Sequence, residues 1–473
     1  MKQKFGIVLS LIFLVSGAFA ADFSLDQYKE EVRKNHLGYH GAMKKSQGAS
    51  ERSEEGSLIF SPTAFSEFQH TDDKRQTVSS TFQGNQTLSQ TYSLGVSQQA
   101  RFGLLGRLSY NIHHTTINGA DPALVPQNEF YDGGLGLELS QPLWRNGFGR
   151  QLKLQEKAQV SSALAASSSE KYNATLILTE AESRYWRLAT ARELVRLQVE
   201  SYDRALKIKD WQDKQMKQRL ADESDLLQAK AALKVRELDL KSAQNEERLA
   251  LKSLNDYRGQ PSTEEVGATV LPPVKEIEGY AAPKRTEDRG DVITARHTLE
   301  ATQANLDINR DRQLPSLDLV GSVNFNGHDP SFSDATSRSF TTQNPLYTVG
   351  VLFSVPLNFG GTSDVRSGYL KENQGAELTF RRRLQDQEND WTDLRQRLED
   401  SQELLRIAIE LESAQKLKLD SERSRFKQGR STTYQISLFV QDYLGAQLSR
   451  VRALFQILNV RTQIKTYEEG GTL

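Results

Sequence analysis

Two long stretches of helical periodicity constrain the fold of this chain more than any other feature of its sequence. In the first, apolar residues recur at steps of three, four and seven, which is the heptad pattern of a coiled coil. These residues are Leu178, Ala181, Tyr185, Leu188, Val195, Val199, Tyr202 and Leu206. A second block of the same kind covers about 364–468. A simple long coiled coil would show the same periodicity, so the pattern alone leaves that alternative open.

Each helical block divides into a long helix and a shorter return helix. The long helices are predicted over 149–219 and 362–429, and the return helices over 222–258 and 432–468. At ~1.5 Å per residue, each long helix would extend roughly 100 Å. The apolar core of a bilayer is only ~30 Å thick, so such a body would reach far beyond any membrane that it touched.

Strand-like alternation of apolar and polar residues lies between the helical blocks. Apolar residues take every second position from Tyr347 to Leu357, from Tyr131 to Leu143, and in a run at 317–325. Tyr and Phe near several strand ends are typical of the interfacial girdle of a membrane barrel, and an ordinary β-sandwich is the alternative. The strands are interleaved with long helices instead of being gathered into one domain, which favours the barrel.

Shorter alternating runs at 91–99 and 104–114 predict an extra hairpin in the first half of the chain. It is expected either in the barrel wall or at the outer mouth of the barrel. Polar segments rich in Gly, Ser, Thr and Asn are predicted as long loops at 71–90, 116–128 and 327–344.

Two similar halves, 21–258 and 291–473, follow from the order of these segments, and the Pro-containing residues 259–290 connect them. An internal duplication is the economical explanation. Each half is expected to hold a helix, then strands, then a helical hairpin. The expected bounds are about 24–52, 57–143 and 149–258 in the first half, and about 291–313, 315–358 and 362–468 in the second.

The same motif ends the last strand of each half, where the chain turns into the long helix. Ser-x-Pro-Leu is followed by a Phe and a Gly in both places. Pro cannot donate to a strand ladder, and Gly tolerates a positive φ, so both suit a strand that turns into a helix. The predicted strand-to-helix exits contain Pro142 and Gly149 in the first half, and Pro356 and Gly360 in the second.

Residues 1–20 have the features of a secretory signal peptide, with a basic start, an apolar run and small residues Ala18 and Ala20 at the cleavage position. An uncleaved membrane anchor is the alternative, but the apolar run is short for a ~20-residue span. No later segment resembles a transmembrane helix. We therefore expect the mature chain either to be soluble outside the cytoplasm or to enter a membrane as a β-barrel.

Too few strands are expected for one chain to close a pore. We count roughly four to six, whereas a barrel needs about eight merely to pack its interior with side chains. Several copies must pool their strands, which predicts a homo-oligomer with cyclic symmetry. The predicted fold class is an α+β membrane channel, in which shared β-strands form a barrel and long antiparallel coiled-coil hairpins continue as a tunnel.

Composition and motifs exclude several functions. The chain has 60 Lys plus Arg against 61 Asp plus Glu, which argues against a nucleic-acid partner. It has no cysteine, hence no thiol nucleophile and no Cys-based metal site. No phosphate-binding loop or nucleophile motif occurs, and His113 and His114, as strand neighbours, face opposite sides. We therefore expect neither an enzyme nor a cofactor or metal site.

Further motifs occur in a defined order: Arg289-Gly-Asp291 opens the second half, Leu314-Pro-Ser-Leu317 starts its strands, and two polar turns form the hairpin tips. Together with the strand exits, this order resembles the TolC-type outer-membrane efflux and secretion channels of Gram-negative bacteria, over essentially the whole mature chain. The resemblance implies a homotrimer in outer-membrane lipid with a large periplasmic portion. It further implies a passive exit duct of a tripartite efflux or type I secretion system, coupled through a periplasmic adaptor to an inner-membrane transporter. An exported coiled-coil envelope spacer or stalk without a pore is the alternative.

The resemblance also implies a gate at the helical tips on the periplasmic side. The family's usual Gly at the first tip is an arginine here, and the archetypal channel's Arg and two rings of Asp at the second tip are replaced by Ser431, Gln435 and Leu438. We expect a helical iris without that ion-pair latch, in which a ring of Leu438 side chains could restrict passage. Ordinary tip packing of Gln435 and Leu438 is the alternative. The candidate tip residues are Arg219, Asp222, Asp225, Leu226, Phe426, Gly429, Ser431, Gln435 and Leu438.

Overall fold

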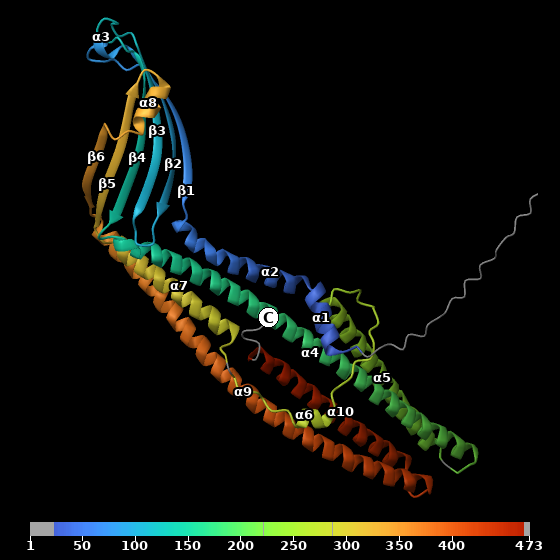
Figure 1. The fold of residues 1–473 in the computed structure, drawn as a ribbon. Coiled ribbons are helices and arrows are strands. Elements are labelled where there is room, and N and C mark those ends of the chain that lie inside the picture. Colours follow the sequence, from blue (N-terminus) through green and yellow to red (C-terminus); the bar gives the residue numbers. More distant parts are fainter. Residues whose placement is uncertain (1–22, 221, 286, 468–473) are drawn as a thin grey trace, which may run out of the picture. The chain divides into compact units, whose positions relative to one another are not determined.

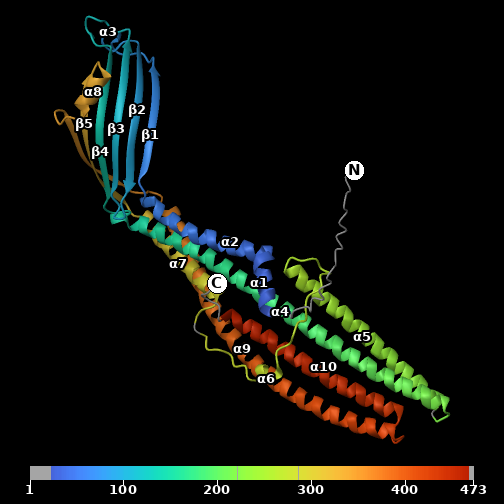
Figure 2. The same ribbon diagram turned by 45° about the vertical axis from the view of Figure 1, so that its right-hand side comes forward.

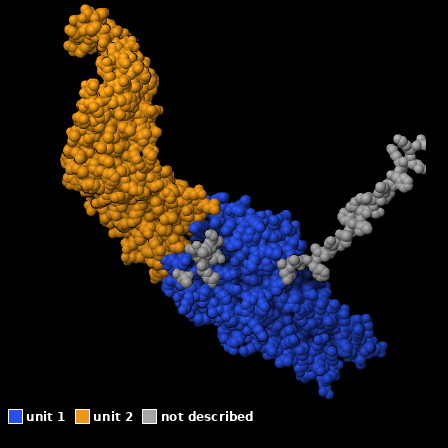
Figure 3. Space-filling model, in the orientation of Figure 1, with its two compact units in different colours: residues 1–44, 170–289, 386–473 blue, residues 45–169, 290–385 orange. Residues whose placement is uncertain are grey.

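The structure is a computed structural model that describes residues 23–220, 222–285 and 287–467. The predicted signal peptide, residues 1–20, lies outside the described residues. The chain forms two compact units, which are coloured separately in Figure 3. Each unit draws on both predicted halves of the sequence. Unit 1 contains residues 1–44, 170–289 and 386–473, and unit 2 contains residues 45–169 and 290–385.

Unit 2 contains a six-stranded antiparallel sheet whose strands lie in the order of the sequence (Figure 1). The β4–β5 pair joins strands from the two halves. Within the described chain, β1 pairs only with β2 and β6 only with β5, so each has one unpaired edge. The strands are β1 (Thr63–Asp73), β2 (Gln86–Gln99), β3 (Leu105–Asn118), β4 (Glu129–Pro142), β5 (Ser316–Asp329) and β6 (Pro345–Ser354).

The pairing register sorts the side chains of the sheet onto two chemically different faces, because neighbours along a strand point to opposite sides. We call these the apolar face and the polar face. One row across the apolar face consists of Val96, Leu108, Leu137, Val323 and Tyr347. The adjacent row on the polar face consists of Ser97, Arg107, Glu138, Ser322 and Thr348. Most large side chains of that apolar row are exposed.

The predicted extra hairpin is part of this sheet. β2 and β3 are 14 residues long and lie between β1 and β4, so they are full members of the sheet and not an addition at its end. Two segments predicted as polar loops instead contain short helices. These are α3 (Ser80–Gln83) and α8 (Phe332–Ser339).

The chain has two antiparallel helical hairpins (Figures 1 and 2), which belong to unit 1 except for residues 150–169 and 359–385 of the long helices, which belong to unit 2. In each, a return helix lies along the C-terminal part of a long helix. The long helices have 68 and 69 residues, which corresponds to about 100 Å of helix each. Among the described residues, no helix combines the length and the hydropathy that a membrane span requires. The hairpins are α4 (Arg150–Lys217) with α5 (Glu223–Tyr257), and α9 (Phe359–Lys427) with α10 (Thr433–Ile464).

The heptad positions of α4 form the core of unit 1. Leu178, Ala181, Tyr185 and Leu188 are all buried, as the seam of a coiled coil requires. They belong to one cluster with residues of α5 and α10, and with Ile277 of the short helix α6 (Val274–Glu278) in the Pro-containing connector. The buried cluster partners on α5 and α10 are Ala250, Leu251, Leu254, Ala453, Leu454, Ile457, Leu458, Val460 and Ile464.

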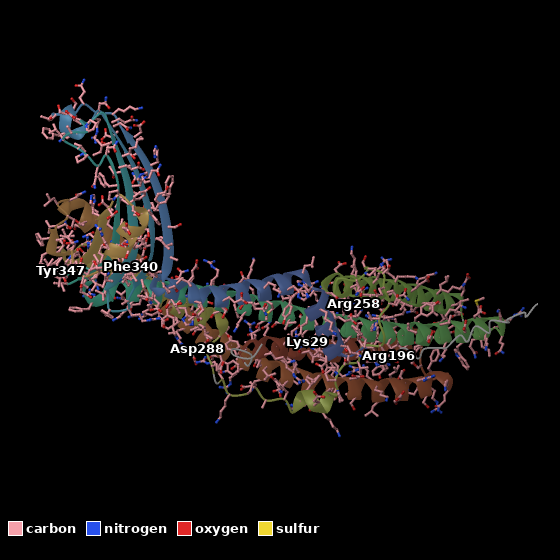
Figure 4. The ribbon with its side chains drawn as sticks, turned by 45° about the horizontal axis from the view of Figure 1, so that its top comes forward. Lys29, Arg196, Arg258, Asp288, Phe340 and Tyr347 are labelled. Atoms are coloured by element: carbon pink, nitrogen blue, oxygen red, sulfur yellow. The ribbon has the colours of Figure 1, made fainter. Side chains whose placement is uncertain are left out.

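One carboxylate is buried within this core. The side chain of Glu182 on α4 is only 2% exposed, and it forms ion pairs with Lys29 at 2.5 Å and with Lys465 at 2.7 Å. Lys29, labelled in Figure 4, comes from α1 (Leu25–Asn35). Burial alone would raise the pKa of Glu182, but the two ammonium groups outweigh it and hold the pKa below its ordinary value.

The first predicted helix, over 24–52, is divided at His36 into α1 and α2 (Leu37–Glu51). His36 has an extended backbone, and its ring Nδ1 lies 3.0 Å from the backbone N of Tyr39, where it accepts a hydrogen bond in the manner of an N-cap. Burial, and then the nearby Arg184, lowers the pKa of His36, which favours the neutral ring that can accept this bond.

The first strand begins later than predicted. Residues Arg52–Phe60 form a 3₁₀ helix, η1, so β1 starts at Thr63 and not near residue 57. In unit 2, α7 (Gly290–Arg312) packs against the N-terminal part of α4 through Ala304 and Ile308.

Candidate functional site

The two hairpin tips have the same backbone turn, although their sequences differ. After α4, the N–H groups of Leu220 and Arg219 donate to the carbonyls of Gln215 and Met216, at 2.9 Å each. After α9, Arg430 and Gly429 make the equivalent bonds to Arg425 and Phe426, at 2.9 and 3.0 Å. This is the Schellman motif, which requires a left-handed residue after the helix. The left-handed residues are Arg219, with φ 59°, and Gly429, with φ 71°.

We expect Arg219→Gly to stabilise unit 1 by roughly 0.5–1 kcal/mol, because glycine removes the cost of a left-handed backbone at a residue with a Cβ. The matched control is Gly429→Ala at the equivalent position of the second tip. An added Cβ there meets nothing within 4 Å, so its expected destabilisation of about 1 kcal/mol is purely conformational. Urea unfolding followed by the helical signal measures both. A lower midpoint for Arg219→Gly would contradict the shared turn.

The second tip is held by its own side chains. Thr432 and Gln435 form a capping box at the start of α10: the Gln435 N–H donates to Thr432 Oγ1, and the Thr432 N–H donates to Gln435 Oε1, both at 3.2 Å. Ser431 Oγ donates to the Glu422 carboxylate at the end of α9. Two of the residues proposed for the gate, Ser431 and Gln435, therefore stabilise the turn itself.

The two hairpins are in contact near their tips within unit 1. Gln212 on α4 donates to Thr433 Oγ1 on α10 at 2.6 Å, and both side chains are buried. An apolar cluster beside this bond includes Phe426, which is half-buried. Its other members are Ile208, Leu419, Ile436, Phe439, Val440 and Tyr443.

Leu438 lines a groove between the hairpins. The groove has a volume of about 350 Å³ and is bounded by α4, α5 and α10, with Ala229 and Val235 on the α5 side. The side chain of Leu438 is 39% exposed, so the groove covers it only in part. In a single chain, Leu438 is thus a groove residue, and its role in a gate stays a prediction.

The first tip carries the acidic residues of the predicted site. Asp222 occupies the N-cap position of α5, and Asp225 lies in the first turn of that helix, where negative charge is favourable because of the helix dipole. Asp222 is exposed and Asp225 is half-buried. Leu226 differs from them because its side chain is buried.

The first strand-to-helix exit is built around an asparagine. After Pro142 ends β4, Asn146 adopts φ 55° and accepts hydrogen bonds from the backbone N–H groups of Gln151 and Leu152 through Oδ1, at 3.0 and 3.3 Å. The Asn146 N–H donates to Asp311 Oδ2 at 2.7 Å. The side chain of Asn146 thus caps the first turn of α4.

Gly149, in the 3₁₀ turn η2 (Gly147–Gly149) before α4, lies directly against the β2–β3 turn. It has φ 75°, and a Cβ added to it would lie 2.4 Å from the carbonyl O of Arg101 and 2.7 Å from the N of Gly103. Arg101 forms two hydrogen bonds with Glu156 on α4, at 2.7 and 2.8 Å. Gly149 is therefore required by both its backbone conformation and its contact.

The second strand-to-helix exit is less tightly packed than the first. Pro356 follows the end of β6, and Asn358 Oδ1 accepts the N–H of Gly361 at 3.0 Å, so an asparagine again caps the long helix. Gly360 has no positive φ, and a Cβ added to it meets nothing within 4 Å. The correspondence between Gly149 and Gly360 in sequence does not extend to their packing.

The histidine pair in β3 faces two sides, as predicted. His113 Nδ1 lies 2.9 Å from Thr91 Oγ1 on the polar face, whereas His114 Nε2 lies 2.8 Å from Glu129 Oε1 on the other side. Within residues 23–220, 222–285 and 287–467, no group of three or more His, Cys, Asp or Glu residues is placed to hold a metal ion.

Sequence reasoning missed the residues that hold these turns. Asn146 and Asn358 cap the long helices, and Gly103 makes room for the first exit. Asn before a Gly-containing helix start is a recognisable capping signal, and Thr432-x-x-Gln435 is a capping box in sequence. The role of Gly103 depends on a contact between distant segments, and no local pattern reveals it.

Several solved structures of outer-membrane proteins have the same architecture. VceC from Vibrio cholerae has a TM-score of 0.66 at 16% identity, with 95% of this chain and 97% of that chain covered. The CmeC outer-membrane channel of Campylobacter jejuni has a TM-score of 0.62 at 14% identity, covering 100% and 94%. The MtrE outer-membrane channel of Neisseria gonorrhoeae has a TM-score of 0.61 at 15% identity, covering 94% and 89%.

No protein-family model matches the sequence, and no curated protein matches it. The likeness therefore lies in the structure, where it extends over nearly the whole of each chain. It includes both the antiparallel sheet and the long helices. The chain has the fold of the TolC-type outer-membrane channels.

Proposed function

We propose that the chain is the subunit of an outer-membrane exit duct, a passive conduit for efflux or secretion. The observation that carries this proposal is the division of the sheet into an exposed apolar face and a polar face. A soluble sandwich buries an apolar sheet face against a second sheet. A membrane barrel instead turns that face to lipid and lines its interior with the polar one.

The unpaired edges of β1 and β6 fit an assembly of several copies. Six strands are fewer than the about eight that a filled barrel requires, so β1 of one copy would pair with β6 of the next. Pairing of this kind closes only if it is repeated around a rotation axis. The TolC-type resemblance implies that three copies assemble into a homotrimer.

The polar face suits the wall of a water-filled passage. Arg107 and Glu138 lie directly opposite each other on neighbouring strands, and His328 Nδ1 lies 2.6 Å from Asp132 Oδ1. These charged groups would remain hydrated in a pore, whereas lipid would make each of them costly. A wall of mixed charge discriminates weakly, so the choice of cargo would rest with an inner-membrane transporter.

The helical hairpins would form the periplasmic part of the duct, and their tips would meet a periplasmic adaptor. The nearly 100 Å of each long helix is suited to crossing a compartment beside the membrane. VceC, CmeC and MtrE, as outer-membrane proteins of this fold, support the localisation. An exported spacer without a pore would leave the exposed apolar face of the sheet without a partner.

Two arginine substitutions on β6 test the assignment of faces. Tyr347 is 70% exposed on the apolar face, in the row of Leu137 near the middle of the strands, and Thr348 lies on the polar face of the same strand. We expect Tyr347→Arg to abolish channel insertion, because arginine on the lipid face costs roughly 2–4 kcal/mol near the midplane. Thr348→Arg should still conduct, with a lower preference for cations.

Conductance of the purified protein in planar lipid bilayers is the measurement. The wild type and Thr348→Arg should both give discrete conductance steps. If the wild type gives none, the duct is excluded and the spacer is favoured. If Tyr347→Arg inserts as readily as Thr348→Arg, the faces are assigned wrongly.

A further inference from the structure

Two glycines on the apolar face of the sheet leave room for the short helix α8 to pack closely against the strands. Gly133 on β4 and Gly327 on β5 are cross-strand neighbours. A Cβ added to Gly327 would lie 2.2 Å from the carbonyl O of Ala335 on α8, and one added to Gly133 would lie 3.2 Å from the same atom. Glycine in a strand interior often marks such a close backbone approach.

The inner side of α8 is fully packed. Ala335 and Ser339 are buried, at 1% and 0% exposure, and Ser339 Oγ lies 3.1 Å from the hydroxyl of Tyr110 on β3. The helix is therefore held in one position, with its small residues toward the sheet. Any large side chain at either end of α8 must lie on its rim or its outer side.

Two phenylalanines flank α8 and are exposed. Phe332 is 53% exposed and Phe340, labelled in Figure 4, is 61% exposed. Each ring also rests on a tyrosine of the sheet: Phe340 stacks on Tyr110 at 5.4 Å between centroids, and Phe332 meets Tyr131 edge-on at 5.8 Å. The four rings form one aromatic group around the helix.

This aromatic group lies where the apolar face ends. Toward the strand exits, the residues on this face of β4 are Leu135, Leu137 and Leu139. Away from the strand exits, Tyr131 pairs with His114. Glu129 is the next residue of β4 on this face, and its Oε1 lies 2.8 Å from His114 Nε2. At the same level, Arg338 of α8 forms an ion pair with Asp329 at 2.9 Å. Aromatic side chains at a border between apolar and charged surface are typical of the headgroup level of a bilayer.

We propose that α8 is a lipid-contacting anchor, with Phe332 at the boundary between headgroups and acyl chains and Phe340, which stacks on Tyr110 in the row of Leu135, deeper among the acyl chains. The occupant is a lipid surface and not a protein, because the exposed rings lie on the same face as the exposed apolar residues of the sheet. In this arrangement the phenylalanine rings bury apolar area in the bilayer, while the ion pair between Arg338 and Asp329 stays at the level of the headgroups. The inference rests on the proposed membrane insertion of the sheet. The anchored leaflet is the one away from the strand-to-helix exits.

Depth-dependent quenching in phospholipid vesicles tests the anchor. The chain has no cysteine, so single substitutions can be labelled with one fluorophore each. The probes are phosphatidylcholine vesicles that carry a nitroxide either on the headgroup or near the end of an acyl chain. We expect Phe332→Cys to be quenched more by the headgroup nitroxide, and Phe340→Cys to be quenched by the acyl-chain nitroxide more than Phe332→Cys is. Tyr347→Cys, on the apolar face of β6 in the row of Leu137, should be quenched most by the acyl-chain nitroxide, and Thr348→Cys, on the polar face, should be quenched by neither.

The failures of the anchor and of the proposed function are distinguishable. If Tyr347→Cys is quenched but Phe332→Cys and Phe340→Cys are not, the sheet inserts and the anchor is overturned. If Tyr347→Cys is not quenched either, membrane insertion itself fails.

A second variant, Gly327→Val, removes the space for α8 while the strands remain. Combined with Phe332→Cys, it should abolish the preference for headgroup quenching. Combined with Tyr347→Cys, it should leave quenching unchanged. Retention of the headgroup preference in Gly327→Val with Phe332→Cys would show that the position of Phe332 does not depend on α8, contrary to the proposal.

Discussion

We expect Gly149→Ala to destabilise unit 2 by roughly 2–5 kcal/mol, the sum of a left-handed backbone with a Cβ and an overlap in a packed contact. The added methyl would lie 2.4 Å from the carbonyl O of Arg101, and that atom belongs to the backbone of the β2–β3 turn. Either the turn or the start of α4 must move. Thermal unfolding of the detergent-solubilised protein, followed by the sheet signal in circular dichroism, measures the loss.

Gly360→Ala is the matched control at the second exit. Gly360 has a helical position without a positive φ, and its added Cβ meets nothing within 4 Å. We expect no loss of stability, or a gain of at most about 1 kcal/mol, because alanine is favoured over glycine in a helix. Equal losses for the two variants would contradict the packing described for the first exit.

Glu182→Ala should destabilise unit 1 by roughly 3–5 kcal/mol, because it leaves two ammonium groups near a buried site without their carboxylate. Lys29 and Lys465 both lie within 2.7 Å of Glu182, and they come from different helical segments. The loss therefore affects the packing of α1, α4 and the end of α10 together. Urea unfolding monitored by the helical signal measures the free energy of unfolding.

The pH dependence of this effect has a defined sign. The pKa of Glu182 is lowered in the folded chain, so the folded state holds the ionised form more strongly than the unfolded state does. The stabilisation is fully present above the ordinary value of 4.5 and is lost as the pH falls through the lower folded pKa. The stability difference between the wild type and Glu182→Gln should therefore be constant near neutral pH and shrink in acid.

Glu403→Ala provides a surface comparison for Glu182→Ala. Glu403 pairs with Arg406 at 2.5 Å, but both side chains are more than half exposed. Exposed ion pairs contribute little to stability, so we expect no measurable change. If Glu182→Ala were as mild as Glu403→Ala, the buried triad would not stabilise the core as described.

Periodicity in the sequence predicted the elements that repeat regularly. Leu178, Ala181, Tyr185 and Leu188 are buried because a heptad seam places them on one side of α4 whatever the partner helix is. The alternation in β4 and β6 likewise determines which residues share a face of the sheet. The predicted combination of an antiparallel sheet with long helical hairpins is confirmed, and VceC and CmeC share this fold.

Features that depend on contacts between distant segments could not be predicted. Residues 327–344 have the composition of a polar loop, and α8 forms there because Gly133 and Gly327 leave room for its backbone on the sheet. The groove around Leu438 likewise depends on how α5 of the first hairpin meets α10 of the second. The break at His36 was missed for a local reason, because a histidine ring is an uncommon helix cap.

Cysteine crosslinking between β1 and β6 tests most directly whether copies share one barrel. The chain has no cysteine, and Phe68 on β1 and Val349 on β6 are exposed on the apolar face at opposite edges of the sheet. Oxidation of Phe68→Cys combined in turn with Val349→Cys and Val351→Cys should link neighbouring copies. For at least one pair, we predict a ladder on denaturing gels that ends at a closed trimer. Disulfides within single chains alone, or no crosslink with either pair, would contradict a barrel closed by pairing between copies.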